Sequence, residues 1–230
     1  MERITFRRWK WQMAIVVLVM LVAGFSDAVA GGKVGGYVLR MEPDGDDAEK
    51  YSRASWGGGL HVVVPVPQVS NVLAGVAGFE YIRMLGKNTE FRDGLTGLRV
   101  EQQTRQHYVR FYVGAQVGGH GHGFFRPHAG VNLALINYGI STDVVIPDDY
   151  DRENEIRQNL RSKNRVVGGY DITLGVDLNF SNTIALDGGV RYLKSFGLPQ
   201  QLGEDAVTIH PQYFQIYLGI GVSFQVFREE

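Results

Sequence analysis

The alternation of apolar and polar residues between positions 213 and 227 constrains the fold more than any other feature of the chain. The even-numbered positions from Phe214 to Val226 are all apolar, whereas most odd-numbered positions are Gln, Gly or Ser. A two-residue period sorts side chains onto two faces only in an extended strand. At ~3.3 Å per residue this stretch is longer than most strands of soluble domains. A fully apolar face opposite a polar, glycine-rich face is typical of a strand between lipid and a narrow interior.

The first 30 residues have the pattern of an export signal. A basic start is followed by the apolar run 13–25, and Ala28-Val29-Ala30 offers a cleavage site after Ala30. The apolar run is shorter than the ~20 residues that a membrane-spanning helix needs, and no later segment approaches that length. We therefore expect a signal peptide at 1–30 and one domain at 31–230, which would enter a membrane only as strands.

Composition excludes several classes of function. Removal of residues 1–30 takes away four of the 23 Lys and Arg and two of the 24 Asp and Glu, which leaves 19 against 22 and a formal charge of −3. This charge argues against a strongly basic nucleic-acid binder. The chain has no cysteine, so disulfides and thiolate chemistry are impossible.

Alternation recurs along the mature chain and predicts eight strands. Polar or glycine-rich connections separate them, in the order long, short, long, short, long, short, long. Antiparallel strands joined in this way place all long loops at one end of an up-and-down barrel. The strands are expected at 33–41, 55–64, 72–84, 107–118, 127–140, 166–180, 184–196 and 213–227.

The longer connections are expected to lack strands. The acidic stretch 42–54 and the polar stretch 86–104 are predicted to be loops. The segment 150–164 is predicted to form a short helix over one mouth of the barrel. Ser181-Asn182-Thr183 is predicted to be a tight turn.

A soluble, lipocalin-like barrel is the alternative architecture, since its strands also alternate. Its polar stripe would face bulk water and should be rich in Lys and Glu. Here the polar stripe of the later strands is mostly Gly, Thr, Asn, Gln and Tyr, which suits a crowded lumen. Aromatic residues gather near strand ends, as in the girdles of membrane barrels: Tyr170, Phe180, Tyr192, Phe196, Phe214 and Phe224.

Strand endings such as RPHAGVNLAL, TLGVDLNF, IALDGGVRYLKSF and YLGIGVSFQVF resemble the small outer-membrane β-barrel superfamily, which includes the outer-membrane protein A barrel and outer-membrane protein W. The resemblance covers nearly all of 31–230. It implies an all-β, eight-stranded antiparallel transmembrane barrel in the outer membrane of a Gram-negative-type bacterium. It also implies that the last strand is a signal for the barrel-assembly machinery, although three residues follow the aromatic Phe227 here.

Charged residues on the lumen side are the most specific candidate site. If the turn at 181–183 closes a hairpin, Asp177 lies opposite Asp187, and like charges on one rung need a cation nearby. Arg191 and Arg110 lie on lumen faces at comparable height. We therefore predict a structural lumen cluster of Asp177, Asp187, Arg191 and Arg110 that closes the barrel. A gated ion path or a ligand-binding role is the alternative.

Other candidate chemistry is weaker. Catalytic carboxylates would need a substrate cleft, and the Gly-x-Ser-x-Gly motif of acyl hydrolases is missing. The pair His120 and His122 lies in a short turn without a third ligand. His61 and His128 are predicted to face inward as hydrogen-bonding groups. No metal site and no cofactor are expected.

The sequence thus predicts a non-enzymatic outer-membrane barrel with long extracellular loops and a structural or surface-interaction role. A narrow channel or a transporter with a lateral opening is the alternative function. A soluble carrier and a lipid-modifying barrel enzyme fit the sequence less well. The expected partners are outer-membrane lipid, the assembly machinery and an extracellular partner, without nucleic acid.

Overall fold

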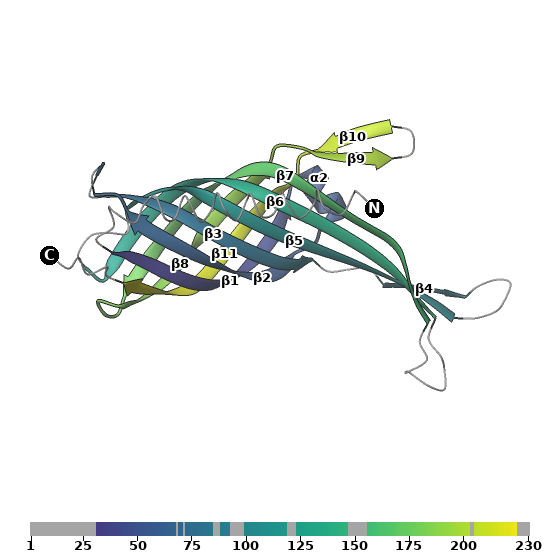
Figure 1. The fold of residues 1–230 in the computed structure, drawn as a ribbon, viewed down its shortest axis with the longest axis horizontal. Coiled ribbons are helices and arrows are strands. Elements are labelled where there is room, and N and C mark those ends of the chain that lie inside the picture. The colour runs from purple at the N-terminus through teal and green to yellow at the C-terminus, as the bar shows by residue number, and fades with distance from the viewer. Residues whose placement is uncertain are drawn as a thin grey trace, which may run out of the picture.

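A computed structural model of the protein describes residues 31–67, 69–70, 72–84, 88–92, 99–118, 123–146, 156–202 and 205–224. Within these ranges, eight antiparallel strands close into a barrel (Figure 1). This confirms the predicted fold class. The barrel strands are β1 (Gly32–Asp44), β2 (Ser55–Pro65), β3 (Leu73–Met84), β5 (Arg99–Gly118), β6 (Phe125–Ile146), β7 (Ile156–Asn179), β8 (Ile184–Ser195) and β11 (Gln212–Phe224).

Closure joins the first strand to the last. β1 pairs with β11 in a register that places Gly36 opposite Ile220 and Met41 opposite Gln215. On the other side of the barrel, β3 pairs with β5. Every barrel strand therefore has two neighbours, and no barrel edge is left to expose unpaired backbone groups, which a lipid environment requires.

The turn between β7 and β8 forms where it was predicted. The Ser181 hydroxyl accepts hydrogen bonds from the backbone N–H groups of Thr183, at 3.2 Å, and Ile184, at 3.0 Å. The Phe180 N–H donates to the Ile184 carbonyl at 3.1 Å. This local bonding fixes the register of the hairpin and hence which residues of β7 and β8 face each other.

The two ends of the barrel differ in their connections, as expected from the sequence. One end, which we call the short-turn end, has the links 66–72, 119–124 and 180–183. The other, the long-loop end, has the short helix α2 (Asp46–Tyr51) and the strands β4 (Asn88–Arg92), β9 (Leu198–Leu202) and β10 (Asp205–Ile209). Figure 1 shows the β9–β10 hairpin and β4, with the ends of β5, β6 and β7, beyond the barrel at this end.

Two predicted loops are therefore wrong in part. The stretch 42–54 contains the helix α2, and 86–104 contains β4 and the first residues of β5. The predicted helix at 150–164 is also wrong, because residues 156–164 belong to β7. Their backbone groups pair with residues 139–146 of β6, a segment that includes the β-branched pair Val144-Val145. This ladder satisfies the backbone without a helix, and a polar segment with no apolar stripe has little reason to form one.

The outward face of the barrel is an apolar belt. In β11 the even positions from Phe214 to Phe224 are between 37% and 59% exposed, whereas Tyr213, Gln215 and Tyr217 are at most 4% exposed. The same alternation runs through the other strands, and exposed Val, Leu, Ile and Phe side chains dominate the outer surface. The structure thus confirms the assignment of even positions of the last strand to the outside. Among the described residues, no helix is long and apolar enough to cross a membrane.

The interior is not polar along its whole length, which corrects one expectation from the sequence. Toward the long-loop end it is packed with apolar and aromatic side chains, and Ala48 of α2 packs against them. The ion-paired charged groups of the lumen lie in the middle and nearer the short-turn end. The apolar part of the interior consists of Leu39, Met41, Ile82, Met84, Tyr108, Ile136, Tyr138, Leu193 and Tyr213.

Candidate functional site: the charged lumen

Glu80 on β3 and Arg110 on β5 form the centre of the lumen. They are rung partners in the β3–β5 ladder, and both side chains are fully buried. Arg110 Nη1 donates a hydrogen bond to Glu80 Oε2 at 2.8 Å. A buried charge is tolerated only when it is paired and hydrogen-bonded, and this pair meets both conditions.

Glu80 gathers side chains from three further strands. The Tyr37 hydroxyl of β1 donates to Oε1 at 2.7 Å, and Arg191 Nη1 of β8 donates to the same oxygen. Gln215 Nε2 of β11 donates to Oε2 at 3.5 Å. One carboxylate therefore ties together side chains from β1, β5, β8 and β11.

Asp171 on β7 is the second acceptor of the central network. It accepts from Arg110 Nη2, and Asn132 Nδ2 of β6 donates to its Oδ1 at 2.7 Å. Arg191 Nε lies 3.5 Å from the same Oδ1. Two arginines face two carboxylates, so the network of Glu80, Asp171, Arg110 and Arg191 is electrically balanced.

Tyrosine rings pack against the two guanidinium groups. Arg110 lies 4.3 Å from the ring centroid of Tyr112, and Arg191 lies 5.1 Å from the centroids of Tyr112 and Tyr217. Such contacts stabilise a desolvated cation. Glycine makes room for one of these rings, since a Cβ on Gly78 would lie 2.4 Å from the Tyr112 hydroxyl.

A second charged group lies nearer the short-turn end. Asp177 is opposite Asp187 in the β7–β8 ladder, as predicted. The cation that the pair requires is Lys33 of β1, whose Nζ lies 2.5 Å from Asp177 Oδ1 and 3.2 Å from Asp187 Oδ2. His61 Nε2 of β2 lies 3.3 Å from Asp187 Oδ2.

The four residues predicted as one lumen cluster therefore separate into two groups. All four are buried in the lumen. Arg110 and Arg191 pair with Glu80 and Asp171, whereas Asp177 and Asp187 pair with Lys33.

Sequence reasoning missed the acidic partner and the basic partner of these groups. Glu80 lies on β3, where the apolar–polar alternation is weak because the outward positions include the small residues Gly75 and Ala77. Glu80 is separated by two and four positions from the inward residues Ile82 and Met84, and this spacing could have placed it on the inward face. Lys33 lies at the start of β1, where one strand alone does not show which charges it can reach.

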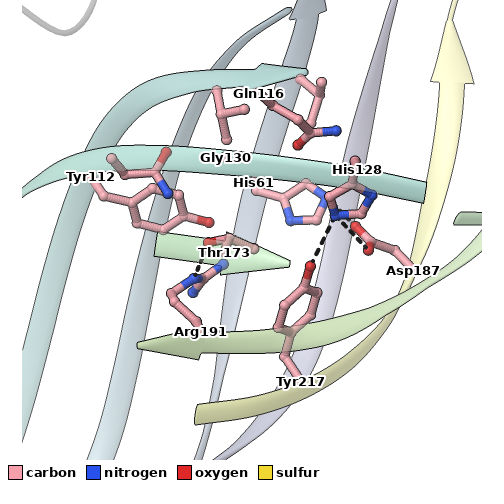
Figure 2. A pocket seen from close by; sticks show the side chains of 12 residues that line it. His61, Tyr112, Gln116, His128, Gly130, Thr173, Asp187, Arg191 and Tyr217 are labelled. Atoms are coloured by element: carbon pink, nitrogen blue, oxygen red, sulfur yellow. Dashed lines mark hydrogen bonds and ion pairs between the residues drawn. The ribbon is translucent and has the colours of Figure 1, made fainter. Parts of the chain in front are cut away.

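The two inward histidines lie where they were predicted. His61 and His128 are 5% and 6% exposed, and His128 Nε2 lies 3.2 Å from the Tyr217 hydroxyl. Figure 2 shows both rings turned toward the interior beside Asp187. His120 and His122, considered as a metal-binding pair, lie outside the described residues.

A small cavity of about 20 Å³ lies between the two groups (Figure 2). Its lining includes His61, His128, Asp187, Arg191 and Tyr217. A space of this size holds water or an ion, and it is far smaller than the several hundred Å³ of a typical organic ligand site. The side chains that line this cavity therefore leave room in it for little more than water or an ion.

Comparison with known proteins gives structural matches only. No protein-family model matches the chain, and no curated protein sequence matches it. Neisserial surface protein A superposes with a TM-score of 0.53 at 11% sequence identity, over 84% of this chain and 97% of the other.

Two further solved structures are a major outer membrane protein from Thermus thermophilus and the outer membrane protein W of E. coli. The first has a TM-score of 0.45 and 11% identity over 84% of this chain and 99% of its own. The second has a TM-score of 0.41 and 15% identity over 85% of this chain and 99% of its own. With its closed, antiparallel strand order and its apolar exterior, the protein has the fold of the small eight-stranded outer-membrane β-barrels.

Proposed function

We propose that the protein is a non-enzymatic outer-membrane barrel whose lumen is closed and whose long-loop end interacts with molecules at the cell surface. The observation that carries this proposal is the central network around Glu80. Its hydrogen bonds and ion pairs reach side chains from every barrel strand except β2. Eight strands enclose a space narrow enough for side chains to fill, which supports a closed lumen.

The outer surface supports a location in the membrane with the long loops at one boundary. Along the outward strand positions, charged side chains are confined to the long-loop end in the described residues. The cations among them come from four strands, and they would meet the anionic phosphates of lipid headgroups. We call this set the basic collar: Arg40, Arg83, Arg105 and Lys194.

The long-loop end also supports the surface-interaction role. β5 continues past the end of β3 and pairs with β4 over residues 99–103. β6 and β7 stay paired out to Ile146 and Ile156. These strands and the β9–β10 hairpin extend beyond the barrel (Figure 1), where a partner in solution could reach them.

An enzyme is disfavoured by the state of the lumen carboxylates. Glu80 and Asp171 are engaged by arginines, and Asp177 and Asp187 share Lys33. A general acid or base must reach a substrate proton, and the adjoining cavity has no room for an organic substrate.

Ion conductance in planar bilayers tests the closed lumen against the channel alternative. We expect the natural barrel to give no stable conductance, and Arg191→Ala to give a measurable one, because the loss of this side chain uncouples Glu80 from β8. Arg40→Ala is the matched control, since its guanidinium pairs with Glu42 on the outer surface. A natural barrel that conducts steadily would favour the channel, and a folded Arg191→Ala barrel that stays silent would refute the closing role of the network.

A further inference from the structure

We propose that the short-turn end of the lumen holds a binding site for a divalent transition metal, with His61, His128, Asp177 and Asp187 as ligands. The proposal goes beyond the closed-barrel function and does not depend on it. It also departs from the expectation, drawn from the sequence, that no metal site exists. That expectation treated the histidines strand by strand, whereas barrel closure brings β2, β6, β7 and β8 together at one point.

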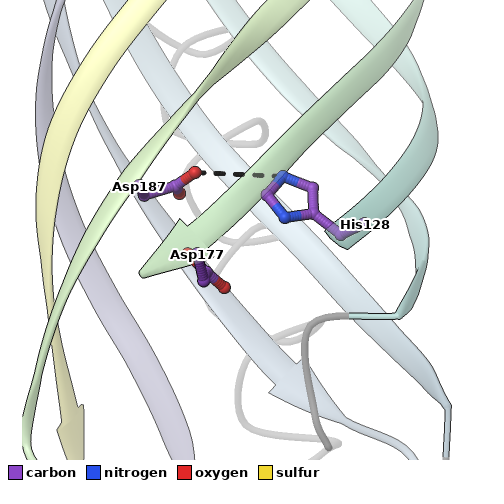
Figure 3. A group of neighbouring side chains, drawn as sticks. All are labelled: His128, Asp177 and Asp187. Atoms are coloured by element: carbon purple, nitrogen blue, oxygen red, sulfur yellow. Dashed lines mark ion pairs between the residues drawn. The ribbon is translucent and has the colours of Figure 1, made fainter. Parts of the chain in front are cut away.

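The spacing of the donor atoms fits a metal. One ligand atom each from His128, Asp177 and Asp187 lies within 4.8 Å of the others (Figure 3). His128 Nε2 is 3.8 Å from Asp187 Oδ1, and His61 Nε2 is 3.3 Å from Asp187 Oδ2. With bonds of ~2.0–2.1 Å, ligand atoms of a tetrahedral site are ~3.3–3.4 Å apart. His61 lies outside this three-residue group and contacts the other oxygen of Asp187, so a four-ligand site requires the His61 ring to move toward the other three ligands.

The contact between His61 and Asp187 has the distance of a metal-bridged pair without the alignment of a hydrogen bond. His61 Nε2 and Asp187 Oδ1 are both buried and without a hydrogen-bond partner. The two residues are 5% and 3% exposed. In a tetrahedral site each metal–ligand bond points ~35° away from the line to the next ligand, so neighbouring ligands are close but misaligned. Buried polar atoms without partners normally require an explanation, and a shared cation is a direct one.

The charge of the group also calls for another cation. Asp177 and Asp187 carry two negative charges, and Lys33 is the one charged partner that the structure places on them within the described residues. With neutral imidazoles the group keeps one uncompensated negative charge in a buried setting, which is costly. Lys33 lies at the start of β1, and its side chain is 11% exposed, so it can withdraw toward the short-turn end.

The donor set selects the class of metal. Two imidazole nitrogens with two carboxylate oxygens suit Zn²⁺ and its neighbours, whereas Mg²⁺ and Ca²⁺ prefer all-oxygen ligands. Four protein ligands make a closed, structural site, in contrast to the open position of a catalytic zinc. The geometry therefore points to a metal that links four strands at the end of the barrel opposite the long loops.

Titration calorimetry with Zn²⁺ tests the proposal on refolded, untagged protein in detergent. The background should carry His120→Ala and His122→Ala, which remove the His-x-His pair from the turn. We expect one Zn²⁺ per barrel with a dissociation constant of about 1 µM or less. Visible absorption of bound Co²⁺ should show the intense bands of four-coordinate geometry.

Variants decide which residues hold the metal. His61→Gln and His128→Gln should each weaken binding at least tenfold, whereas His210→Gln, on an exposed position near the long-loop end, should leave it unchanged. Lys33→Met should bind at least tenfold more tightly, because it removes the competing ammonium group. A heat-modifiable shift on gels confirms that each variant is folded, and any that is not is replaced by the corresponding Asn substitution.

Three outcomes would overturn the proposal. The first is no binding at millimolar Zn²⁺, and the second is binding that survives both His61→Gln and His128→Gln. The third is Zn²⁺ binding by Lys33→Met and not by the natural protein, which would show that the Lys33 ammonium group, and not a metal, occupies the space between Asp177 and Asp187. Since conductance is measured separately, failure here leaves the closed-lumen function standing, and an open natural barrel leaves the metal site standing.

Discussion

Glu80 lies directly opposite Arg110 on the β3–β5 ladder, and the two fully buried side chains meet in the lumen at 2.8 Å. The pair is local in the ladder, but Glu80 also accepts hydrogen bonds from Arg191 and Tyr37, whose strands lie on other sides of the barrel. Its carboxylate therefore links strands on different sides of the barrel.

Neutralising Glu80 should destabilise the barrel strongly. Glu80→Gln keeps the shape of the side chain but leaves Arg110 and Arg191 with Asp171 as their remaining carboxylate. The loss of one partner from a buried ionic group costs about 3–5 kcal/mol. Urea unfolding in liposomes measures this change in free energy.

Glu42→Gln is the matched control for that experiment. Glu42 pairs with Arg40 at 2.6 Å, but both side chains are more than a third exposed. An exposed pair contributes about 0–1 kcal/mol. Equal losses for the two variants would contradict the importance of the buried network.

Two glycines of β3 should respond in opposite ways to alanine. A Cβ on Gly78 would lie 2.4 Å from the Tyr112 hydroxyl, whereas a Cβ on Gly75 meets its nearest atom at 3.9 Å. We expect Gly78→Ala to cost about 1–3 kcal/mol through overpacking. Gly75→Ala should be neutral or stabilise by up to about 1 kcal/mol, because alanine loses less backbone entropy in a strand. The same unfolding assay compares them, and a harmless Gly78→Ala would show that the tyrosine ring moves freely.

A charge in the apolar belt should be costly only if lipid surrounds it. Leu218 is 53% exposed near the middle of β11, and Gln212 lies at its long-loop end. In a bilayer, Leu218→Arg should cost about 2–4 kcal/mol and Gln212→Arg about 0–1 kcal/mol. If both variants unfold like the natural chain in liposomes, the outward face does not contact lipid.

Single cysteines can establish which end of the barrel faces the exterior, since the chain has none of its own. Asp46 in α2 and Ser181 in the β7–β8 turn are both exposed and lie at opposite ends. On intact cells, a membrane-impermeant maleimide should label Asp46→Cys and spare Ser181→Cys, with both labelled after lysis. The reverse pattern would invert the proposed orientation.

Residue alternation was sufficient to predict the barrel, because consecutive side chains of a strand point to opposite faces, one inside and one outside. The Asp177–Asp187 rung could be predicted for a similar reason, since a tight turn at Ser181 fixes the register a few residues away. Contacts within one hairpin can therefore be predicted from the sequence.

Contacts across the lumen could not be predicted in this way. Lys33 and Asp177 are separated by 144 positions, and they meet only because all eight strands close with one particular stagger. The strand at 156–164 was missed for a related reason, because its partner β6 and not its own composition keeps it extended.

The reach of Glu80 has a kinetic consequence. Two of its hydrogen-bond donors, Arg191 and Gln215, belong to β8 and β11, and β11 comes beside β1 and β2 only when the first strand pairs with the last. Interactions that form after the transition state slow unfolding and leave the folding rate almost unchanged. The network should therefore change the rate of barrel assembly little, and it should slow unfolding and so lengthen the lifetime of the assembled barrel.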